Sequence, residues 1–327
     1  MIDVNLGWHK ELRNFHQLSK TGLTILLYHG VTDSKSYGIE NWQGKHISSK
    51  KFKEQMQYLK SNCNPISVDR WLEYYNSKEP LPENSVLVSF DDGFRNNWEI
   101  AAPILIEFGL PAVFYITSGV VSTELMFWVD VLEDCLNLCE KPYINLKLDK
   151  VIKFSIKNDN EKFQALLKIK NWCKKVSSKK KDYVLEQVKE ATGIEPSTAH
   201  AKNYAKITWK QLKEMYDNRL FTIGGHSLYH NILSSLGDKD LEHEIKCSLD
   251  MLKVNLGGPI QHYSYPEGQE IHYDKRVISL LKSEGITCSP TAICGINGPH
   301  DNPFHLRRIM VGFNGTPFPY TEETLIS

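Results

Sequence analysis

The stretch SFDDGFRNN, residues 89–97, places two carboxylates side by side, Asp91 and Asp92, between an apolar run and a glycine. Successive side chains of a β-strand point to opposite faces, so a strand has little use for two adjacent aspartates. A turn at the end of a strand can instead direct the two carboxylates to different places. Asp-Asp-Gly is also a common turn without further function, because Asp bonds its own backbone and Gly adopts positive φ.

The segments around this stretch alternate between short apolar runs and helical patterns. The run at 85–90 precedes the aspartates, a helical pattern ending at Gly109 follows them, and another apolar run comes at 111–121. The stretches at 23–31 and 221–227 have the same strand character and contain a histidine near their ends. This alternation predicts parallel βα units, whose ligands bind at the carboxyl ends of the strands.

The pattern changes between residues 122 and 206, where helical segments dominate and lysines are frequent. We interpret this part as a helical insertion beside the active face. Its lysines fit either a solvated helix face or a surface that guides an anionic substrate. The alternation then resumes, for about six or seven strands in total. The sequence therefore predicts an α/β fold with one barrel-like domain over residues 1–327 and a helical insertion at 122–206.

Composition excludes several classes of protein. Of the 327 residues, 41% are hydrophobic and 24% charged, which is ordinary for a globular protein with a sizeable core. Equal numbers of basic and acidic residues, 39 each, give no electrostatic argument for binding nucleic acid or an anionic membrane. No apolar stretch approaches the roughly 18–20 residues that span a bilayer. The N-terminal residues lack the apolar core of a signal peptide, so we expect a cytoplasmic protein.

The cysteines fit the same compartment. There are seven, scattered along the chain, and an odd number does not suit a disulfide framework. Cys135 and Cys139 lie four residues apart in a helical pattern, without a second pair at the spacing of a zinc site. We expect reduced thiols in the core.

Polar groups close three of the expected strands: His29, the pair Asp91 and Asp92, and the pair His226 and His230. Two imidazoles and one carboxylate form a ligand set that suits a catalytic divalent metal and leaves positions open. The two histidines of the third group are four residues apart, a spacing that shares one helical face but also arises by chance on a surface. In the functional interpretation, one aspartate binds the metal while its neighbour takes a proton from the attacking water.

Two motifs carry a resemblance to a known family. SFDDG at 89–93 and HSLYH at 226–230 resemble T-F-D-D-G and H-[ST]-x-x-H, the first two motifs of polysaccharide deacetylases of the NodB-homology type, carbohydrate esterase family 4. YSYPEG at 263–268 also looks like this family, and the resemblance runs from about residue 23 to 308. It implies a deformed (β/α)7-type barrel and metal-dependent hydrolysis of the N-acetyl groups of amino sugars.

On the matched positions, the resemblance implies a role for each residue of the two motifs. Asp91 would be the general base, and Asp92, His226 and His230 would bind the metal, usually zinc. Cobalt, nickel and iron remain alternatives, because the order of metal affinities alone does not fix which metal a site holds.

The third motif of the family, R-x-P-[YF], is altered here. The four residues at its place are Ser264, Tyr265, Pro266 and Glu267. The family's arginine orients the base, so the orientation of Asp91 is open. Arg307 and Arg308 are candidates for the missing guanidinium, and a role as surface charges is the alternative. Residues 265–267 are candidates for substrate and oxyanion contacts, because the backbone N–H of Glu267 does not depend on its side chain.

The family's L-x-H motif, which supplies the general acid, has no copy near the C-terminus. His305 lies there, in the wrong order, whereas Leu27-Tyr28-His29 reads L-x-H at the other end of the chain. A circularly permuted barrel, in which the first strand takes the place of the last, would bring His29 to the site. We state this as a hypothesis, and a structural histidine at a strand end is its rival.

The sequence thus favours an enzyme that hydrolyses the N-acetyl, or another N-acyl, amide of an amino sugar. A cytoplasmic location favours a nucleotide-linked or lipid-linked sugar, as in a precursor of a surface polysaccharide or glycolipid. A non-catalytic carbohydrate-binding protein on the same barrel is the alternative. A non-haem iron oxygenase is a third possibility, because two histidines and a carboxylate also form its metal site. The second aspartate is unexplained by either alternative.

Overall fold

The computed structural model describes residues 18–199, 201–312 and 318–319. Residues 1–17, on which the prediction about a signal peptide rests, therefore lie outside the described residues. Among the helices of the described ranges, none is long and apolar enough to cross a membrane.

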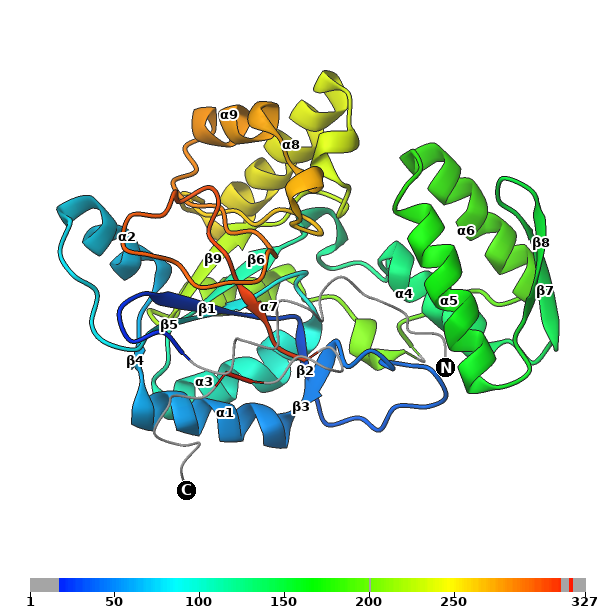
Figure 1. Ribbon diagram of the computed structural model, residues 1–327, viewed down its shortest axis with the longest axis horizontal. Helices are drawn as coiled ribbons and strands as arrows, with labels where there is room; N and C mark the ends of the chain where they lie inside the picture. The colour runs from blue at the N-terminus through cyan, green and yellow to red at the C-terminus, as the bar shows by residue number, and fades with distance from the viewer. Residues whose placement is uncertain (1–17, 200, 313–317, 320–327) are drawn as a thin grey trace.

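A parallel β-sheet forms the centre of the larger part of the molecule (Figure 1). Its strand order is β10-β1-β5-β6-β9, and the short strand β4 pairs with the start of β5. Because these pairs are parallel, the carboxyl ends of the strands lie at one edge. The strands are β1 (Leu23–Tyr28), β4 (Asn64–Pro65), β5 (Ser85–Phe90), β6 (Ala112–Ile116), β9 (Phe221–Gly225) and β10 (Ile309–Met310). Two further strands, β2 (Gly30–Thr32) and β3 (His46–Ser48), pair with each other.

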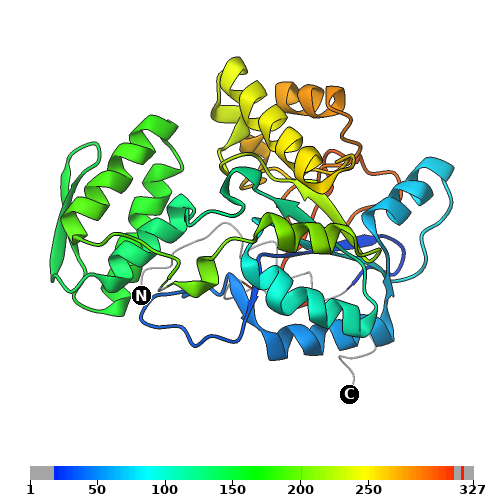
Figure 2. The same ribbon diagram turned by 180° about the vertical axis from the view of Figure 1, so that it is seen from behind.

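Helices flank this sheet, with α1 and α3 on one side and α8 and α9 on the other (Figures 1 and 2). The helix end predicted at Gly109 is confirmed, with φ of 67° at this residue, and Gly257 ends α8 in the same way with φ of 74°. Ser48 caps the start of α1 through its hydroxyl, and Thr208 opens α7 with a capping box. The helices of this part are α1 (Ser49–Asn62), α2 (Val68–Ser77), η2 (Asn97–Ala101), α3 (Ala102–Phe108), η3 (Ser118–Val120), α7 (Trp209–Tyr216), η5 (Leu233–Ser235), α8 (Asp238–Leu256), η6 (Glu270–His272) and α9 (Lys275–Ser283).

Beyond β9, the segments expected as strands near residues 260–266 and 286–292 make only isolated bridges. Gly225 pairs with Tyr263, and His262 pairs with Cys288. A Cβ at Gly224 would lie 2.8 Å from the carbonyl oxygen of His262, so only glycine permits this approach. The mixed α/β fold is therefore confirmed, whereas the closed (β/α)7 barrel stays a prediction.

The first strand of the fold lies beside the last one. Leu26 and Leu27 of β1 pair with Ile309 and Met310 of β10. This neighbourhood is the one that the permutation hypothesis requires, although the permutation itself stays a hypothesis.

The insertion packs around a core of its own, separate from that of the sheet, and stands at one side of the molecule (Figures 1 and 2). Its elements are α4 (Trp128–Leu138), β7 (Tyr143–Lys147), β8 (Val151–Ser155), α5 (Asp159–Cys173), α6 (Ser178–Thr192) and η4 (Lys202–Tyr204). The prediction of a helical insertion is incomplete, because β7 and β8 form an antiparallel hairpin. Ile144 and Leu146 are buried while their neighbours in β7 are exposed, and this alternation is typical of a strand with one covered face. That residues 1–327 form one domain with this insertion remains our proposal.

Candidate metal centre and catalytic site

The turn after β5 separates the two adjacent aspartates. Asp92 and Gly93 both have left-handed backbone conformations, with φ of 81° and 82°, and the amide of Asp91 still donates to the carbonyl of Tyr28 at 3.0 Å. Asp91 thus continues the pairing of β5 with β1, while Asp92 already belongs to the turn. Both side chains are buried. The turn gives each carboxylate its own surroundings, as the sequence predicted.

Asp92 faces the two histidines of the second motif. Its Oδ1 atom lies 3.6 Å from Nε2 of His226 and 3.4 Å from Nε2 of His230. Two ligands about 2.1 Å from a tetrahedral zinc ion would be about 3.4 Å apart. Within the described chain, Oδ1 is a buried acceptor that receives no hydrogen bond, which is costly unless a cation compensates it. The three residues therefore fit a divalent metal.

The two histidines converge through a turn and not along a helix, so the argument from helical spacing was wrong. Ser227 and His230 have φ of 66° and 59°, and the amide of His230 donates to the Ser227 hydroxyl at 2.8 Å. Left-handed residues fold the backbone back on itself within five residues, which brings the imidazoles together over a short distance. Their ring centroids are 5.0 Å apart.

The surroundings of both imidazoles favour metal binding. Nδ1 of His226 lies 2.8 Å from the carbonyl oxygen of Ser264, an acceptor, so this nitrogen carries the proton and Nε2 keeps its lone pair. Burial lowers the pKa of His230 to about 4, which keeps that ring neutral at physiological pH. Neutral imidazole is the form that coordinates metals.

Arg308 supplies the guanidinium that the altered third motif lacks. Its Nη1 and Nη2 atoms donate to the two carboxylate oxygens of Asp91 at 2.8 and 2.7 Å, and Nη2 also donates to the Ser264 hydroxyl at 3.0 Å. Ser264 stands where the family has arginine, and its hydroxyl donates to Asp91 at 3.1 Å. Arg308 is fully buried, whereas Arg307 is exposed, so the former occupies the site and the latter is a surface charge.

This pair fixes the charge of Asp91. Burial alone would raise the pKa of the carboxyl group, but Arg308, followed by His226, outweighs burial and lowers the pKa to about 2. Asp91 is therefore ionised at neutral pH. Its Oδ2 atom lies 4.0 Å from Nε2 of His226, so a carboxylate base stands directly beside the three metal-ligand candidates.

His29 directly follows β1, the neighbour of β5, and it interacts electrostatically with the site. Burial lowers the pKa of His29, and the negative charges of Asp92 and Asp91 oppose that effect. Its backbone carbonyl accepts from Nδ2 of Asn97 at 2.8 Å. The histidine near the N-terminus thus lies within the field of both aspartates, as the permutation hypothesis expects.

Residues 265–267 have three different environments. Tyr265 is 1% exposed, its hydroxyl donates to the carbonyl of Phe304 at 3.1 Å, and its ring stacks on Tyr273. Pro266 has no N–H to donate. Glu267 has φ of 60° and forms an ion pair with Lys174, the residue that ends α5. The backbone amide of Glu267 stays a candidate for the oxyanion donor, as the sequence suggested.

Sequence reasoning did not single out Lys174, nor did it predict a buried cluster between the insertion and the sheet. In that cluster, Lys45 forms an ion pair with Asp130 of α4. The ammonium of Lys206 lies 3.6 Å from the ring centroid of Phe127, and burial lowers its pKa to about 7. These contacts join residues far apart in the chain, so no local motif announces them.

Comparisons with known proteins support the family that the motifs indicate. The family model described as polysaccharide deacetylase matches residues 182–289, which contain His226 and His230. The poly-beta-1,6-N-acetyl-D-glucosamine N-deacetylase of Staphylococcus aureus (strain MSSA476) is 29% identical over 119 residues. That match covers 36% of this chain and 39% of the staphylococcal protein, so it spans about two fifths of the curated relative.

Solved structures share the fold over most of the chain. IcaB from Ammonifex degensii superposes with a TM-score of 0.58 at 18% identity, over 89% of this chain and 93% of that protein. The Streptococcus pyogenes deacetylase PplD, solved in complex with acetate, superposes with a TM-score of 0.59 at 16% identity, over 94% and 98% of the two chains. In sequence, residues 182–289 match the polysaccharide deacetylase family, and most of the chain shares the fold of these two solved proteins.

Proposed function

We propose that this protein is a metal-dependent hydrolase that removes the N-acetyl, or another N-acyl, group from an amino sugar of a glycan. The observation that carries this proposal is the position of Asp91, an ionised base held by Arg308 beside Asp92, His226 and His230. A metal-binding site alone has no need for such a base. The match of residues 182–289 to the polysaccharide deacetylase family supports the same chemistry.

Each residue of the site has a distinct part in this reaction. Asp92, His226 and His230 would hold a divalent metal such as zinc, which would supply a Lewis acid to polarise the acyl carbonyl and acidify water. Asp91 accepts the proton of the attacking water. Arg308 holds both oxygens of Asp91, so it orients the base and keeps it ionised. The amide of Glu267 donates to the oxygen that becomes negative.

The leaving amine needs a proton, and we assign its delivery to His29. An amine leaves as a neutral molecule only if an acid protonates it as the carbon–nitrogen bond breaks. Burial lowers the pKa of His29 overall, and the charges of Asp92 and Asp91 act in the opposite direction, so these two carboxylates stabilise the imidazolium that would donate the proton. In this assignment β1 carries the general acid, which the resemblance places near the last strand of the family's barrel. This is the role that the permutation hypothesis gives to β1.

The substrate class follows from the relatives and the chain's composition. A staphylococcal relative is named for poly-beta-1,6-N-acetyl-D-glucosamine, which makes linked N-acetylglucosamine the first substrate to test. A nucleotide-linked or lipid-linked precursor in the cytoplasm remains our proposal from the sequence. The alternative function is a non-catalytic carbohydrate-binding protein. It does not explain why Arg308 holds the carboxylate of Asp91 beside the candidate metal ligands.

The proposed activity predicts release of acetate from a β-1,6-linked N-acetylglucosamine oligosaccharide by the zinc-loaded protein, measured by an enzyme-coupled acetate assay. Chelation of the metal should abolish the release, and added zinc should restore it. Asp91→Asn should lower turnover by at least about a hundredfold while the folded protein still binds the sugar, because the amide cannot accept the proton of the attacking water. Sugar binding without acetate release by the wild-type protein would instead favour the binding-protein alternative.

Asp92→Asn should lose the metal. The amide oxygen is neutral and cannot compensate the cation, so we expect near-stoichiometric zinc in the wild type and little in the variant, measured by mass spectrometry of metals after identical purification. Asp69→Asn is a matched control, because Asp69 lies outside the site and pairs with His262. Equal metal content in the Asp92 variant and the wild type would refute this ligand set.

Arg308→Lys should lower kcat by about 10- to 100-fold with the metal retained, because a lysine cannot bond both oxygens of Asp91. The double variant Ser264→Arg with Arg308→Ser returns the guanidinium to the place where the family carries it, so it should recover part of this loss. Steady-state kinetics with metal analysis would test both variants. Turnover of Arg308→Lys within twofold of the wild type would show that Arg308 does not position the base.

His29→Gln should lower kcat by about 10²- to 10⁴-fold, the usual contribution of an acid catalyst, while metal content and KM change little. His305→Gln is the control, because His305 is exposed and bonds the hydroxyl of Tyr273. Kinetics and metal analysis of both variants would decide the matter. Nearly normal turnover of the His29 variant would leave this residue a structural role.

A further inference from the structure

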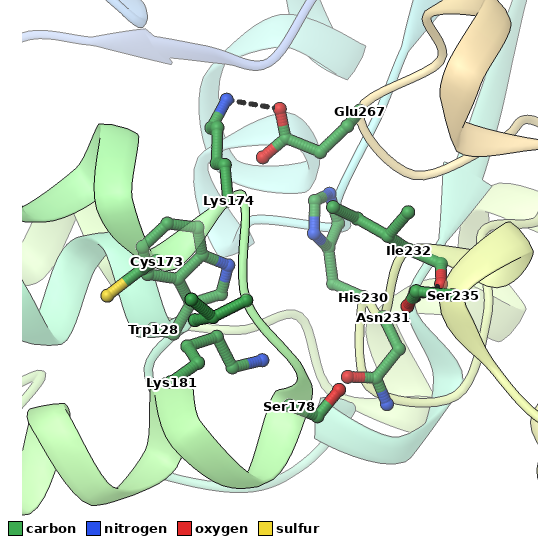
Figure 3. Close-up of a pocket in the computed structure, with 11 residues that line it drawn as sticks. Trp128, Cys173, Lys174, Ser178, Lys181, His230, Asn231, Ile232, Ser235 and Glu267 are labelled. Carbon is green, nitrogen blue, oxygen red and sulfur yellow. Dashed lines mark hydrogen bonds and ion pairs between the residues drawn. The ribbon is translucent and has the colours of Figure 1, made fainter. Parts of the chain in front are cut away.

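A pocket lies between the insertion and the sheet-containing part of the molecule, and it begins at the metal centre. His230 belongs both to the proposed ligand set and to the lining of this pocket. Figure 3 shows two facing walls, one built by Trp128, Lys174 and Lys181 of the insertion and the other by the loop around His230. The pocket is therefore within reach of any substrate whose reactive group occupies the metal centre.

The wall formed by the insertion has the composition of a sugar-binding surface. Trp128 stands at the start of α4, is partly exposed, and offers a flat apolar face. Ser178 and Asn231 line the same pocket with groups that can bond hydroxyls. An aromatic platform with a few convergent polar groups is the usual lining of a site for a small polar ligand.

The charged residues that line the pocket are more often basic than acidic. Its lining contains two lysines and one carboxylate, Glu267, which pairs with Lys174 across the two walls (Figure 3). The side chain of Lys181 is only 15% exposed, and within the described chain its ammonium has one carboxylate in ion-pair range, Asp182 at 3.8 Å. That distance is longer than a hydrogen bond, and the side chain of Asp182 is 67% exposed to water. Lys181 thus brings to the pocket an ammonium without a closely bonded anion, and an anionic ligand there could accept a charge-assisted hydrogen bond from it.

The positions of Trp128 and Lys181 suit one ligand. The ammonium of Lys181 lies 5.8 Å from the ring centroid of Trp128. A sugar stacked on the indole at a contact distance of about 4 Å would hold its exocyclic substituents beside that ammonium. A charge-assisted hydrogen bond from Lys181 would then select a sugar with a phosphate or carboxylate substituent.

We propose that this pocket is a subsite for the sugar next to the one that is deacetylated, with Trp128 as its platform and Lys181 as the residue that favours an anionic substituent. The proposal rests on the proposed function for the identity of the neighbouring sugar. It gives the insertion a role in choosing the substrate, and it predicts that a glycan with an anionic substituent binds more tightly than the neutral one.

The test compares two probes on the zinc-loaded protein: a β-1,6-linked N-acetylglucosamine trisaccharide, and the same trisaccharide with one phosphate monoester. The wild type should bind the phosphorylated probe about tenfold more tightly, measured by calorimetry and, where acetate is released, by KM. Lys181→Ala should remove this preference with kcat unchanged. Trp128→Ala should weaken the binding of both probes by up to about tenfold, with Trp128→Phe intermediate.

Matched controls come from the same helix. Lys180→Ala and Tyr183→Ala change exposed residues of α6 that do not line the pocket, so they should leave both affinities within twofold. Because Trp128 also packs against the core of the insertion, the melting temperature of each variant is measured beside its affinity. A carboxylated trisaccharide distinguishes a preference for phosphate from a preference for any anion.

The outcomes separate the subsite from the proposed function. Hydrolysis of 4-nitrophenyl acetate reports the metal centre without a second sugar, and it should be unaffected by Lys181→Ala. If the wild type releases no acetate yet binds the phosphorylated probe through Lys181, the subsite stands and the proposed function fails. If neither probe is preferred, or Lys180→Ala acts like Lys181→Ala, the subsite proposal is overturned.

Discussion

The bidentate ion pair between Arg308 and Asp91 is the interaction on which the rest of the site depends. Both groups are buried, and a buried ion pair is tolerated only when hydrogen bonds satisfy its remaining atoms. Here Nε of Arg308 donates to the carbonyl of Thr291 at 2.6 Å, and the hydroxyl of Ser264 bonds both partners. Removal of the arginine alone would leave a buried carboxylate without compensation, at a cost of about 3–5 kcal/mol. The pair therefore constrains the last strand as firmly as it constrains the base.

The position of β10 follows from that constraint. Arg308 directly precedes β10, which pairs with β1, and β1 pairs with β5, whose end carries Asp91. A shift of β10 by one residue would turn the side chain of Arg308 away from Asp91, because neighbouring side chains of a strand point to opposite faces. The segment in which the sequence offers two candidate arginines is thus the one that completes the site. Ser264, small and buried, leaves the space that the guanidinium fills.

Local chemistry made much of the fold and of the site predictable from the sequence. Ser48, Thr208 and Gly109 end their helices as short-range rules require, and the Asp91-Asp92 turn and the two histidines are contiguous motifs. What the sequence could not decide depends on contacts between distant residues. The sequence alone does not distinguish Arg307 from Arg308, because the two arginines are neighbours. The register of β10 decides that Arg308 is buried and Arg307 exposed. The pairing of Lys174 with Glu267 joins residues 93 positions apart in the chain. The turn between His226 and His230 was not predicted, because a spacing of four residues also fits a helix.

The backbone around the metal centre has a property that reaches beyond the site. Four of the eight non-glycine residues with positive φ in the described ranges are Asp92, Ser227, His230 and Glu267. Such conformations cost on the order of 1–3 kcal/mol each and persist only where the surrounding structure enforces them. The surrounding structure therefore holds the candidate ligands in place without help from an ion. The affinity for a metal would then depend on the packing of the core below the site. A substitution that only loosens the packing of the sheet should lower that affinity before it unfolds the chain.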